Sequence, residues 1–315
     1  GDIALPAVAV SLAEVVSTGY GTQLAGSVTG AVTKVSAEEF NTGRIVSPEQ
    51  LIESKVAGVQ VIDNNEPGGG MSIRIRGATS INASSDPLYV VDGLPIGTGG
   101  GISTSGRDPL NFLNPNDIEN ITVLKGGEAA SIYGANAANG VVLIQTKGGR
   151  PGTTHVDYTS SVSASQVTRL PSMLDATQFA AAVKQYAPQN ASQLQNASTD
   201  WFAQIDRTGV GQEHNLAVSG AGQSNAYRLS LGYLNQDGII KGSSTQRVSL
   251  GLNYSQRLFG DHLDVNTNLR GSRSLDQFAP GGVLSNAAQM GPTQPVTDPA
   301  SGGTFRSRTT MPTFA

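Results

Sequence analysis

The chain has 315 residues, of which 38% are hydrophobic and 14% charged, and its formal net charge is -4 at pH 7. This size and apolar content exclude a chain that is disordered throughout, and the low charge without a basic cluster argues against nucleic acid as a partner. The absence of cysteine excludes disulfides, thiolate metal sites and cysteine nucleophiles.

The first β-prone segment lies near the N-terminus, at residues 14–18, and is followed at once by Gly19 and Gly21. One interpretation is an ordinary edge strand. The other is a free strand that a partner protein adds to its own sheet, because such β-augmentation relies on main-chain hydrogen bonds and tolerates varied side chains. The residues alone leave both interpretations open.

A mixed pattern of strands and short helices follows. A strand is expected at residues 28–35, with Ser36 as the cap of a first turn, and the pair Ser47-Pro48 predicts a helix that runs to about Val56. A further strand is expected at residues 59–62. The glycines at 68–70 predict a turn, and no phosphate loop, because neither Lys-Ser/Thr nor a helix follows them.

Two runs that alternate in period two form the centre of this region. They read MSIRIRG at residues 71–77 and DPLYVVDG at residues 86–93, and both end on a glycine that can turn the chain. They predict a compact sheet with one charged face, on which Arg74 and Arg76 lie. The ordinary interpretation of two such arginines is a solvated face.

The region ends with a flexible loop, two more strands and a boundary. Residues 93–111 are rich in glycine, which is typical of a mobile linker or a functional loop. Strands are expected around residues 117–125 and 138–144. The Gly/Pro-rich residues 146–152 predict a domain boundary.

Long alternating segments follow this boundary. The clearest are residues 156–162, 227–233, 247–254 and 262–270; a fifth, at 212–219, has a less clear face because His214 shares its parity with two apolar residues. Runs this long, with aromatic residues near the ends of the apolar face, favour a membrane barrel over a soluble sandwich. The links alternate between long and short, as the loops and turns of outer-membrane barrels do. The longest link contains helical segments at 175–186 and 200–207.

The last segment, residues 276–315, is rich in proline and predicts a loop with no clear strand. About five strands cannot enclose a domain, whereas large plugged barrels use about 22. We therefore expect these residues to be part of a longer protein.

The sequence contains no constellation of catalytic or metal-ligating residues. Its histidines, His155, His214 and His262, are expected on separate strands, without the spacing of metal ligands. Neither a nucleophile elbow nor a pair of carboxylates stands out. We predict no enzyme, no metal and no cofactor.

Several motifs in order resemble the SusC/RagA-like branch of the TonB-dependent outer-membrane transporters. Residues 12–21 resemble the Ton box, residues 55–61 (KVAGVQV) a plug segment, and the two central runs and the strands around 117–125 and 138–144 other plug segments. The chain departs from the family pattern after Lys125, where Gly126-Gly127-Glu128-Ala129 replaces the usual Asp-Ala-Ser.

The resemblance implies an α+β plug domain followed by the first antiparallel strands of a transmembrane β-barrel. The implied organisation is residues 1–23 with the Ton box, 24–152 as plug, 153–275 as the first barrel strands and 276–315 as an extracellular-loop-like segment. The implied location is the outer membrane of a Gram-negative bacterium, with plug and N-terminus on the periplasmic side.

The resemblance also implies three groups of functional residues. The TonB-binding strand is Glu14, Val15, Val16, Ser17 and Thr18; the plug–barrel interface contains Arg74, Arg76 and Lys125; and the substrate-facing plug loop contains Gly99, Gly100, Gly101 and Arg107. A mobile linker fits that loop equally well.

The implied function is import of a glycan or peptide, driven by TonB pulling on the Ton box and plug. The implied partners are TonB, a SusD-like surface lipoprotein and outer-membrane lipid. The alternative is a non-transporting binding or assembly module whose open β edges other chains complete. A secreted hydrolase domain has no catalytic residues to support it.

Overall fold

The computed structural model describes residues 15–17, 22–24, 31–63, 66–77, 85–98, 110–150, 152–260, 262–298 and 304–305. Its contacts divide the chain into two compact units. The first holds the described residues up to Ser161 together with Glu213–Leu234 and Gln246–Leu275; the second holds Val162–Gln212, Asn235–Thr245 and the described residues from Asp276 onward. Near the N-terminus, β1 (Val15–Ser17) pairs antiparallel with β2 (Thr22–Leu24).

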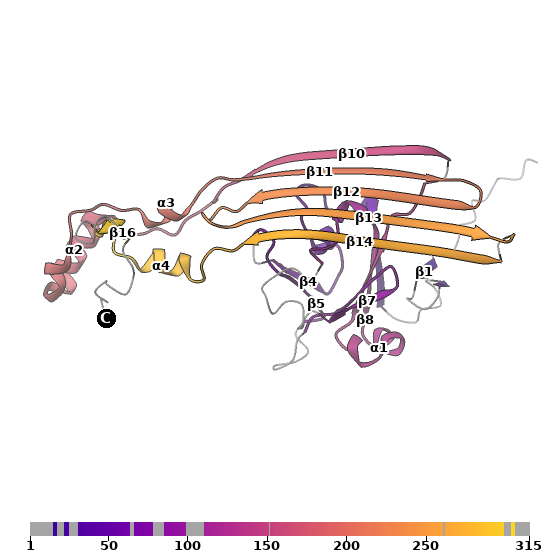
Figure 1. The fold of residues 1–315 in the computed structure, drawn as a ribbon. Helices are drawn as coiled ribbons and strands as arrows, with labels where there is room; N and C mark the ends of the chain where they lie inside the picture. Colours follow the sequence, from indigo (N-terminus) through magenta and orange to yellow (C-terminus); the bar gives the residue numbers. More distant parts are fainter. Residues whose placement is uncertain are drawn as a thin grey trace, which may run out of the picture. The chain divides into compact units, whose positions relative to one another are not determined.

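The N-terminal domain of the first unit, residues 31–150, is built on a mixed five-stranded sheet (Figure 1). The strands are β3 (Ala31–Ser36), β6 (Leu88–Val91), β7 (Leu94–Thr98), β8 (Ile118–Lys125) and β9 (Val141–Thr146). Their order is β3-β8-β9-β6-β7, and only the pair β6 and β9 is parallel. The central strands are rich in valine, leucine and isoleucine because both faces are partly covered.

Each face of this sheet has its own apolar core. On one face, Ile121, Val123 and Val142 pack with residues of the short helix η3 (Pro48–Ile52) and of the hairpin β4 (Val59–Asp63) and β5 (Met71–Ile75). On the other face, Leu124 and Val141 pack beneath α1 (Gly127–Tyr133) and η7 (Gly134–Ala137). A Cβ added to Gly140 would lie 2.9 Å from the carbonyl oxygen of Leu124, and φ is +95 there, so this position requires glycine.

The short helices of the domain differ in part from the expectation. Ser36 and Ser47 are the N-caps of η2 (Ala37–Glu39) and η3, as predicted, and each also forms a capping box. The helix from Pro48, however, ends at Ile52 rather than near Val56, because Glu53 leaves the helical conformation. Helix α1 was not predicted, and the loop expected at residues 93–111 was wrong in its first part, because β7 forms at Leu94–Thr98.

The second sheet contains five long strands in sequence order, with neighbours running in opposite directions (Figure 1). They are β10 (Gly152–Ser165), β11 (Gly209–Ala221), β12 (Asn225–Asp237), β13 (Ser244–Leu258) and β14 (Leu263–Gln277). The predicted strands are confirmed. His262, expected in a strand, instead lies in the turn before β14.

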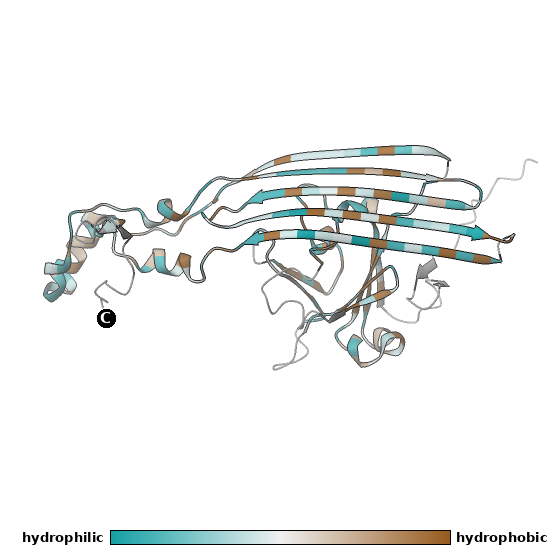
Figure 2. Ribbon diagram, viewed as in Figure 1, coloured by the Kyte–Doolittle hydropathy of each residue, from teal (hydrophilic) through white to brown (hydrophobic). Residues whose placement is uncertain are grey.

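Side chains alternate along these strands between an apolar exposed face and a polar face (Figure 2). Exposed apolar residues include Val156, Tyr158, Leu229, Leu231, Val248, Leu250, Val265 and Leu269. In the first unit, the polar face of β11 to β14 lies toward the N-terminal domain. Arg228, Ser230 and Arg247 are buried there, whereas Asn266 and Asn268 on β14 are exposed. We call this the inward face.

The second unit carries short helices between and after the long strands. They are α2 (Ala176–Tyr186), capped by Asp175, then η8 (Pro188–Gln193), α3 (Trp201–Ile205) and α4 (Val283–Gln289). The segment after 276 contains α4 and a small pair of strands, β15 (Thr297–Asp298) with β16 (Thr304–Phe305), where no clear strand was expected. Its role as an extracellular loop stays a prediction. Among the described residues, no helix has the length and hydropathy to cross a membrane.

Candidate functional site

The candidate site is the polar seam, which we define as the hydrogen bonds and ion pairs between the N-terminal domain and the inward face of β11 to β14. Glycines make room for it. A Cβ at Gly232 on β12 would lie 2.5 Å from Asn114 Nδ2, and one at Gly251 on β13 would lie 2.6 Å from Ser230 Oγ. Gly232 therefore lets the segment around Asn114 approach the strands closely, and Gly251 leaves room for Ser230, whose hydroxyl donates to Asp117.

The first cluster of the seam is centred on Asp117, at the end of η6 (Pro115–Asp117), which Asn114 caps. Arg228 Nη2 donates to Asp117 Oδ1 at 2.9 Å, and Ser230 Oγ donates to Oδ2 at 2.6 Å. The side chains of Arg228 and Asp117 are only 7% and 13% exposed. An ion pair this sheltered from water is little screened by salt.

Lys147 lies beside this cluster, and its Nζ donates to the carbonyl of Asn116 at 2.9 Å. Burial lowers the pKa of Lys147, and the charge of Arg228 lowers it further, whereas Asp117 acts in the opposite direction. The carboxylate of Asp117 thus offsets two neighbouring cations, Arg228 and Lys147.

The second cluster is centred on Asp92, in the tight turn between β6 and β7. Asp92 adopts a left-handed backbone conformation with φ 47, and its carboxylate accepts hydrogen bonds from the backbone and hydroxyl of Thr146. Arg270 on β14 pairs with Asp92 Oδ2 at 2.8 Å, with both side chains 14% exposed. One carboxylate therefore joins two strands of the domain to the long-stranded sheet.

Asn253 on β13 completes this second cluster. Its Nδ2 donates to Thr146 Oγ1 at 3.0 Å and to the carbonyl of Lys147 at 2.7 Å. Its Oδ1 accepts from Arg270 at 3.0 Å. Arg270 also donates to the hydroxyl of Thr146.

Further hydrogen bonds hold the segment of residues 111–116 against β11 and β13. Asn114 donates to Asn215 Oδ1 at 2.7 Å, and Asn116 donates to Glu213 Oε1 at 2.7 Å. Arg247 donates to Asn111 Oδ1 at 2.8 Å. The contacts that define the seam are hydrogen bonds and ion pairs. Since a hydrogen bond has a net value of about 1 kcal/mol when water can replace it, such an interface can exchange its bonds for water more readily than an apolar one.

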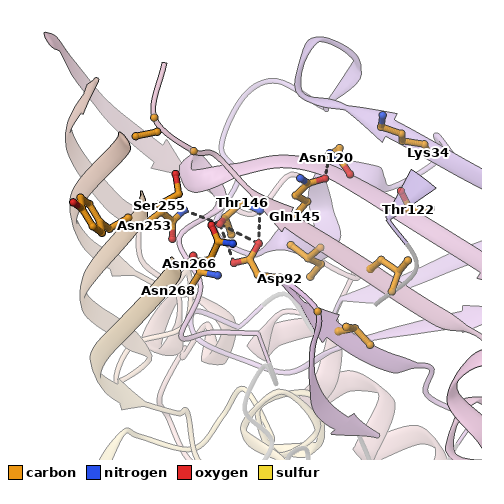
Figure 3. A pocket seen from close by; sticks show the side chains of 18 residues that line it. Lys34, Asp92, Asn120, Thr122, Gln145, Thr146, Asn253, Ser255, Asn266 and Asn268 are labelled. Carbon is orange, nitrogen blue, oxygen red and sulfur yellow. Dashed lines mark hydrogen bonds between the residues drawn. The ribbon is translucent and has the colours of Figure 1, made fainter. Parts of the chain in front are cut away.

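A polar cavity of about 350 Å³ lies next to the second cluster (Figure 3). Its walls come from β3, β6, β8 and β9 of the N-terminal domain and from the long strands β12 to β14. Figure 3 shows Asn253, Asn266 and Asn268 on one side and Asn120 with Gln145 on the other.

The structure places two of the residues that the sequence predicted for this interface on β5 and its end. Arg74 and Arg76 are both exposed, and Arg76 has a positive φ of 61 at the end of the strand. Neither belongs to the seam as described above. Their role at the interface stays a prediction.

Lys125, the third predicted interface residue, is bonded within the N-terminal domain. Its Nζ donates to Thr33 Oγ1 at 3.0 Å and to the carbonyl of Ala57 at 2.8 Å, and the residue is 8% exposed. These bonds tie β8 to β3 and to the turn before β4. Burial, with a smaller contribution from the charge of Arg76, lowers the pKa of Lys125.

We expect Lys125→Met to lower the stability of the domain by about 1–3 kcal/mol at pH 7, because the carbonyl of Ala57 loses its donor. The pKa of Lys125 is lower in the folded than in the unfolded chain, so the charged lysine costs stability at neutral pH and this cost falls as pH rises toward about 10. The difference in the free energy of unfolding between the wild type and Lys125→Met should therefore increase with pH. This difference can be measured by labelling a cysteine introduced at the buried position Val123 at increasing concentrations of urea. A difference in the free energy of unfolding that does not depend on pH contradicts the prediction.

The other predicted residues are only partly described. Of the predicted TonB-binding residues, Val15, Val16 and Ser17 form β1, while Glu14 and Thr18 lie outside the described residues. The predicted loop residues Gly99, Gly100, Gly101 and Arg107 also lie outside them.

Sequence reasoning missed the seam itself, including Asp92, Asp117 and the arginines that pair with them. A signal was present: Arg228, Arg247 and Arg270 alternate with apolar residues on predicted strands, which places them on the polar face. His214, by contrast, lies on the apolar face, where Tyr158 and Ser160 hydrogen-bond its Nδ1 at 2.9 and 3.0 Å. Within the described residues, no cluster of His, Asp or Glu could hold a metal ion.

Comparisons with known proteins identify this architecture. A model of the TonB-dependent receptor plug domain matches residues 25–141. The TonB-dependent receptor SusC of Bacteroides thetaiotaomicron is 38% identical over 90% of this chain, and receptor P39 of Formosa agariphila is 36% identical over 92%. The structure of the RagAB peptide importer in its open-open state matches 84% of this chain with a TM-score of 0.69 and 27% identity.

The chain spans 29% of the length of SusC, 28% of that of P39 and 33% of the matched RagAB chain. It carries the plug domain of a TonB-dependent receptor, followed by strands like the first of its barrel; this family is non-enzymatic and resides in the Gram-negative outer membrane. Within the family it belongs to the SusC/RagA-like receptors. We now call residues 31–150 the plug and β10 to β14 the wall strands.

Proposed function

We propose that the receptor containing these residues imports a nutrient such as a glycan or a peptide, with energy supplied by TonB. The observation that carries the proposal is the polar seam. Hydrogen bonds and two ion pairs hold the plug against the wall strands, and water can replace them when the plug is displaced. An interface of this kind suits a domain that must hold its place and yet move during transport.

In this proposal TonB binds the strand of residues 14–18, namely Glu14, Val15, Val16, Ser17 and Thr18, by β-augmentation. The exposed apolar face of the wall strands contacts outer-membrane lipid. A SusD-like lipoprotein covers the extracellular side, and the loop with Gly99, Gly100, Gly101 and Arg107 meets the substrate. Arg74, Arg76 and Lys125 remain candidates for contacts with the rest of the barrel wall.

A test of the TonB assignment uses the full-length receptor in cells. Deletion of residues 12–20 is expected to abolish uptake and leave surface binding of substrate unchanged. Val16→Pro should act in the same way, because proline removes a main-chain donor that β-augmentation requires. Val16→Thr, which keeps the donor and the β-branched shape, is the matched control. Normal uptake by both the deletion and the proline variant would refute the assignment.

The alternative function, a binding or assembly module completed by other chains, rests on the sheet edges. In the described sheet, β10 and β14 each pair with one neighbouring strand only. Strands with an open edge need a partner, from the same or another chain. Uptake that depends on residues 12–20 favours the transporter over this alternative.

A further inference from the structure

We propose that an apolar groove in the second unit is the packing site for a further segment of the same polypeptide, which connects two later wall strands. The groove has a volume of about 470 Å³. We call the segments that connect successive wall strands links. The inference adds an interaction surface and its occupant to the receptor. It rests on the architecture of the receptor and goes beyond the proposed transport.

Three segments of the second unit form the walls of the groove. The β10–β11 link contributes Leu170, Phe202 and Ile205, the β12–β13 link contributes Ile239 and Ile240, and the segment after β14 contributes Leu284. The two links are joined by their main chains, since Lys241 N donates to the carbonyl of Ile205 at 2.8 Å. Trp201 Nε1 donates to the carbonyl of Gly291 at 3.0 Å and so ties the first link to the third segment. The groove is therefore shaped by its own hydrogen bonds rather than by an occupant.

Apolar side chains of the groove are exposed. Leu170 is 40% exposed and Leu284 is 51% exposed. A second hollow of about 280 Å³ shares Leu170 and Phe202 with the groove and adds Met173 and Leu174, both 50% exposed. Contiguous exposed apolar surface of this kind marks a site of contact with another part of the protein, with a partner or with a ligand. The groove thus needs an occupant.

The topology of the wall brings further links to the same place. Because neighbouring wall strands run in opposite directions, the β10–β11 link, the β12–β13 link and the segment after β14 all leave from the same end of the sheet. The chain spans 29% of the length of SusC and 33% of the matched RagAB chain, and plugged barrels use about 22 strands. A receptor of that length has more links, and every second one lies at the end where the groove is formed.

The composition of the groove favours a permanent neighbour. Apart from Arg169, Asp206 and Ser285, every described residue of the lining is apolar. Interfaces between proteins that associate and separate are about as apolar as the rest of the surface, whereas permanent ones are more apolar. A link of the same polypeptide is a permanent neighbour, and its packing does not cost the loss of free movement that association of a separate protein does. We therefore assign the groove to an apolar link.

The first test compares two neighbouring positions on α4 in the purified full-length receptor alone, after replacement of any native cysteine. Ala288 lines the groove and Gln289 does not, although both are exposed here. We expect Ala288→Cys to react with a small thiol reagent at least about tenfold more slowly than Gln289→Cys, because the link must open first. Equal rates in the receptor alone, including a difference that arises only when a companion protein is added, would overturn the proposal.

The second test identifies the occupant by photo-crosslinking. Leu284→Cys, modified with a benzophenone maleimide and irradiated in the receptor alone, should be joined to a peptide of the same polypeptide outside residues 1–315. Tyr186→Cys is the matched control, since Tyr186 is 79% exposed on α2 and does not line the groove, and it should give no such product. A product with a second copy, a product confined to residues 1–315, or no polypeptide product would overturn the assignment.

A third measurement asks whether apolar contact holds the link. Leu170→Asp with Leu284→Asp should raise the labelling rate of Ala288→Cys by about tenfold, toward that of Gln289→Cys, because a buried carboxylate without a partner is costly. Tyr186→Asp should leave the rate unchanged. The labelling rate of Gln289→Cys should stay constant in all these variants, which shows that α4 remains folded. An unchanged rate for Ala288→Cys in the double variant would contradict packing in the groove.

These measurements need neither TonB nor uptake. Their failure therefore overturns the packing site and leaves the proposed transport untouched. Uptake that persists in Val16→Pro and in the deletion overturns the transport assignment instead.

Discussion

Arg270→Ala is expected to weaken the hold of the wall strands on the plug by about 3–5 kcal/mol, because it leaves the carboxylate of Asp92 buried without its charge partner. Both side chains are only 14% exposed, so water cannot readily replace the guanidinium. Thr146 and Asn253 lose a shared donor at the same time. The measurement is urea-dependent labelling of a cysteine at Val123 in the full-length receptor.

Two comparisons make this first result specific. Asp92→Asn combined with Arg270→Gln should recover a large part of the loss, since it removes both charges and keeps groups that can hydrogen-bond. Arg150→Ala removes an exposed pair with Asp157, at 3.8 Å and with side chains 57% and 45% exposed, and should change stability by less than about 1 kcal/mol. If Arg270→Ala lowers stability no more than Arg150→Ala does, the role assigned to Asp92 is contradicted.

Asp117→Asn is expected to have a comparable effect at pH 7, about 3 kcal/mol or more, because Arg228 is 7% exposed and loses its counter-charge. The substitution also removes a charge that raises the pKa of Lys147, so this pKa falls further below its ordinary value. A charged Lys147 then costs stability at neutral pH. This cost disappears as pH rises through the lowered pKa.

The loss in Asp117→Asn should therefore shrink as pH rises from about 7 to about 10, where free lysine begins to lose its proton. The same cysteine reporter, read across this range, measures the trend. Asp157→Asn is the matched control, since Asp157 also raises the pKa of Lys147 but its side chain is 45% exposed, and its effect should be small at every pH. A loss that grows with pH would show that Lys147 is not coupled to Asp117.

The two ion pairs of the seam connect different parts of the plug sheet to different wall strands. Asp92 joins the end of β9 and the β6–β7 turn to β14, whereas Asp117 joins the start of β8 to β12. Each pair fixes a different strand of the plug sheet. If TonB displaces the plug, as we propose, each of the two pairs must break or move with it.

The sequence by itself determined the long strands of this protein and the strands of its plug sheet except β7. Strict alternation placed apolar residues such as Leu229 and Leu231 on one face of β12 and Arg228 and Ser230 on the other, because successive side chains in a strand point to opposite faces. The five long strands, the capping serines Ser36 and Ser47 and the plug motifs could be predicted for the same reason. Each of these features is encoded by residues that are close to one another in the sequence.

Only the tertiary structure decided which polar groups meet. Arg228 and Asp117 are 111 residues apart, and no local pattern links them. Lys125 shows the same limit, because its strand was predicted correctly while the groups that its amine contacts, Thr33 and Ala57, come from other segments. Pairing across a seam depends on register and on close approach at Gly232 and Gly251, and these arise only when the whole sheet is assembled against the plug.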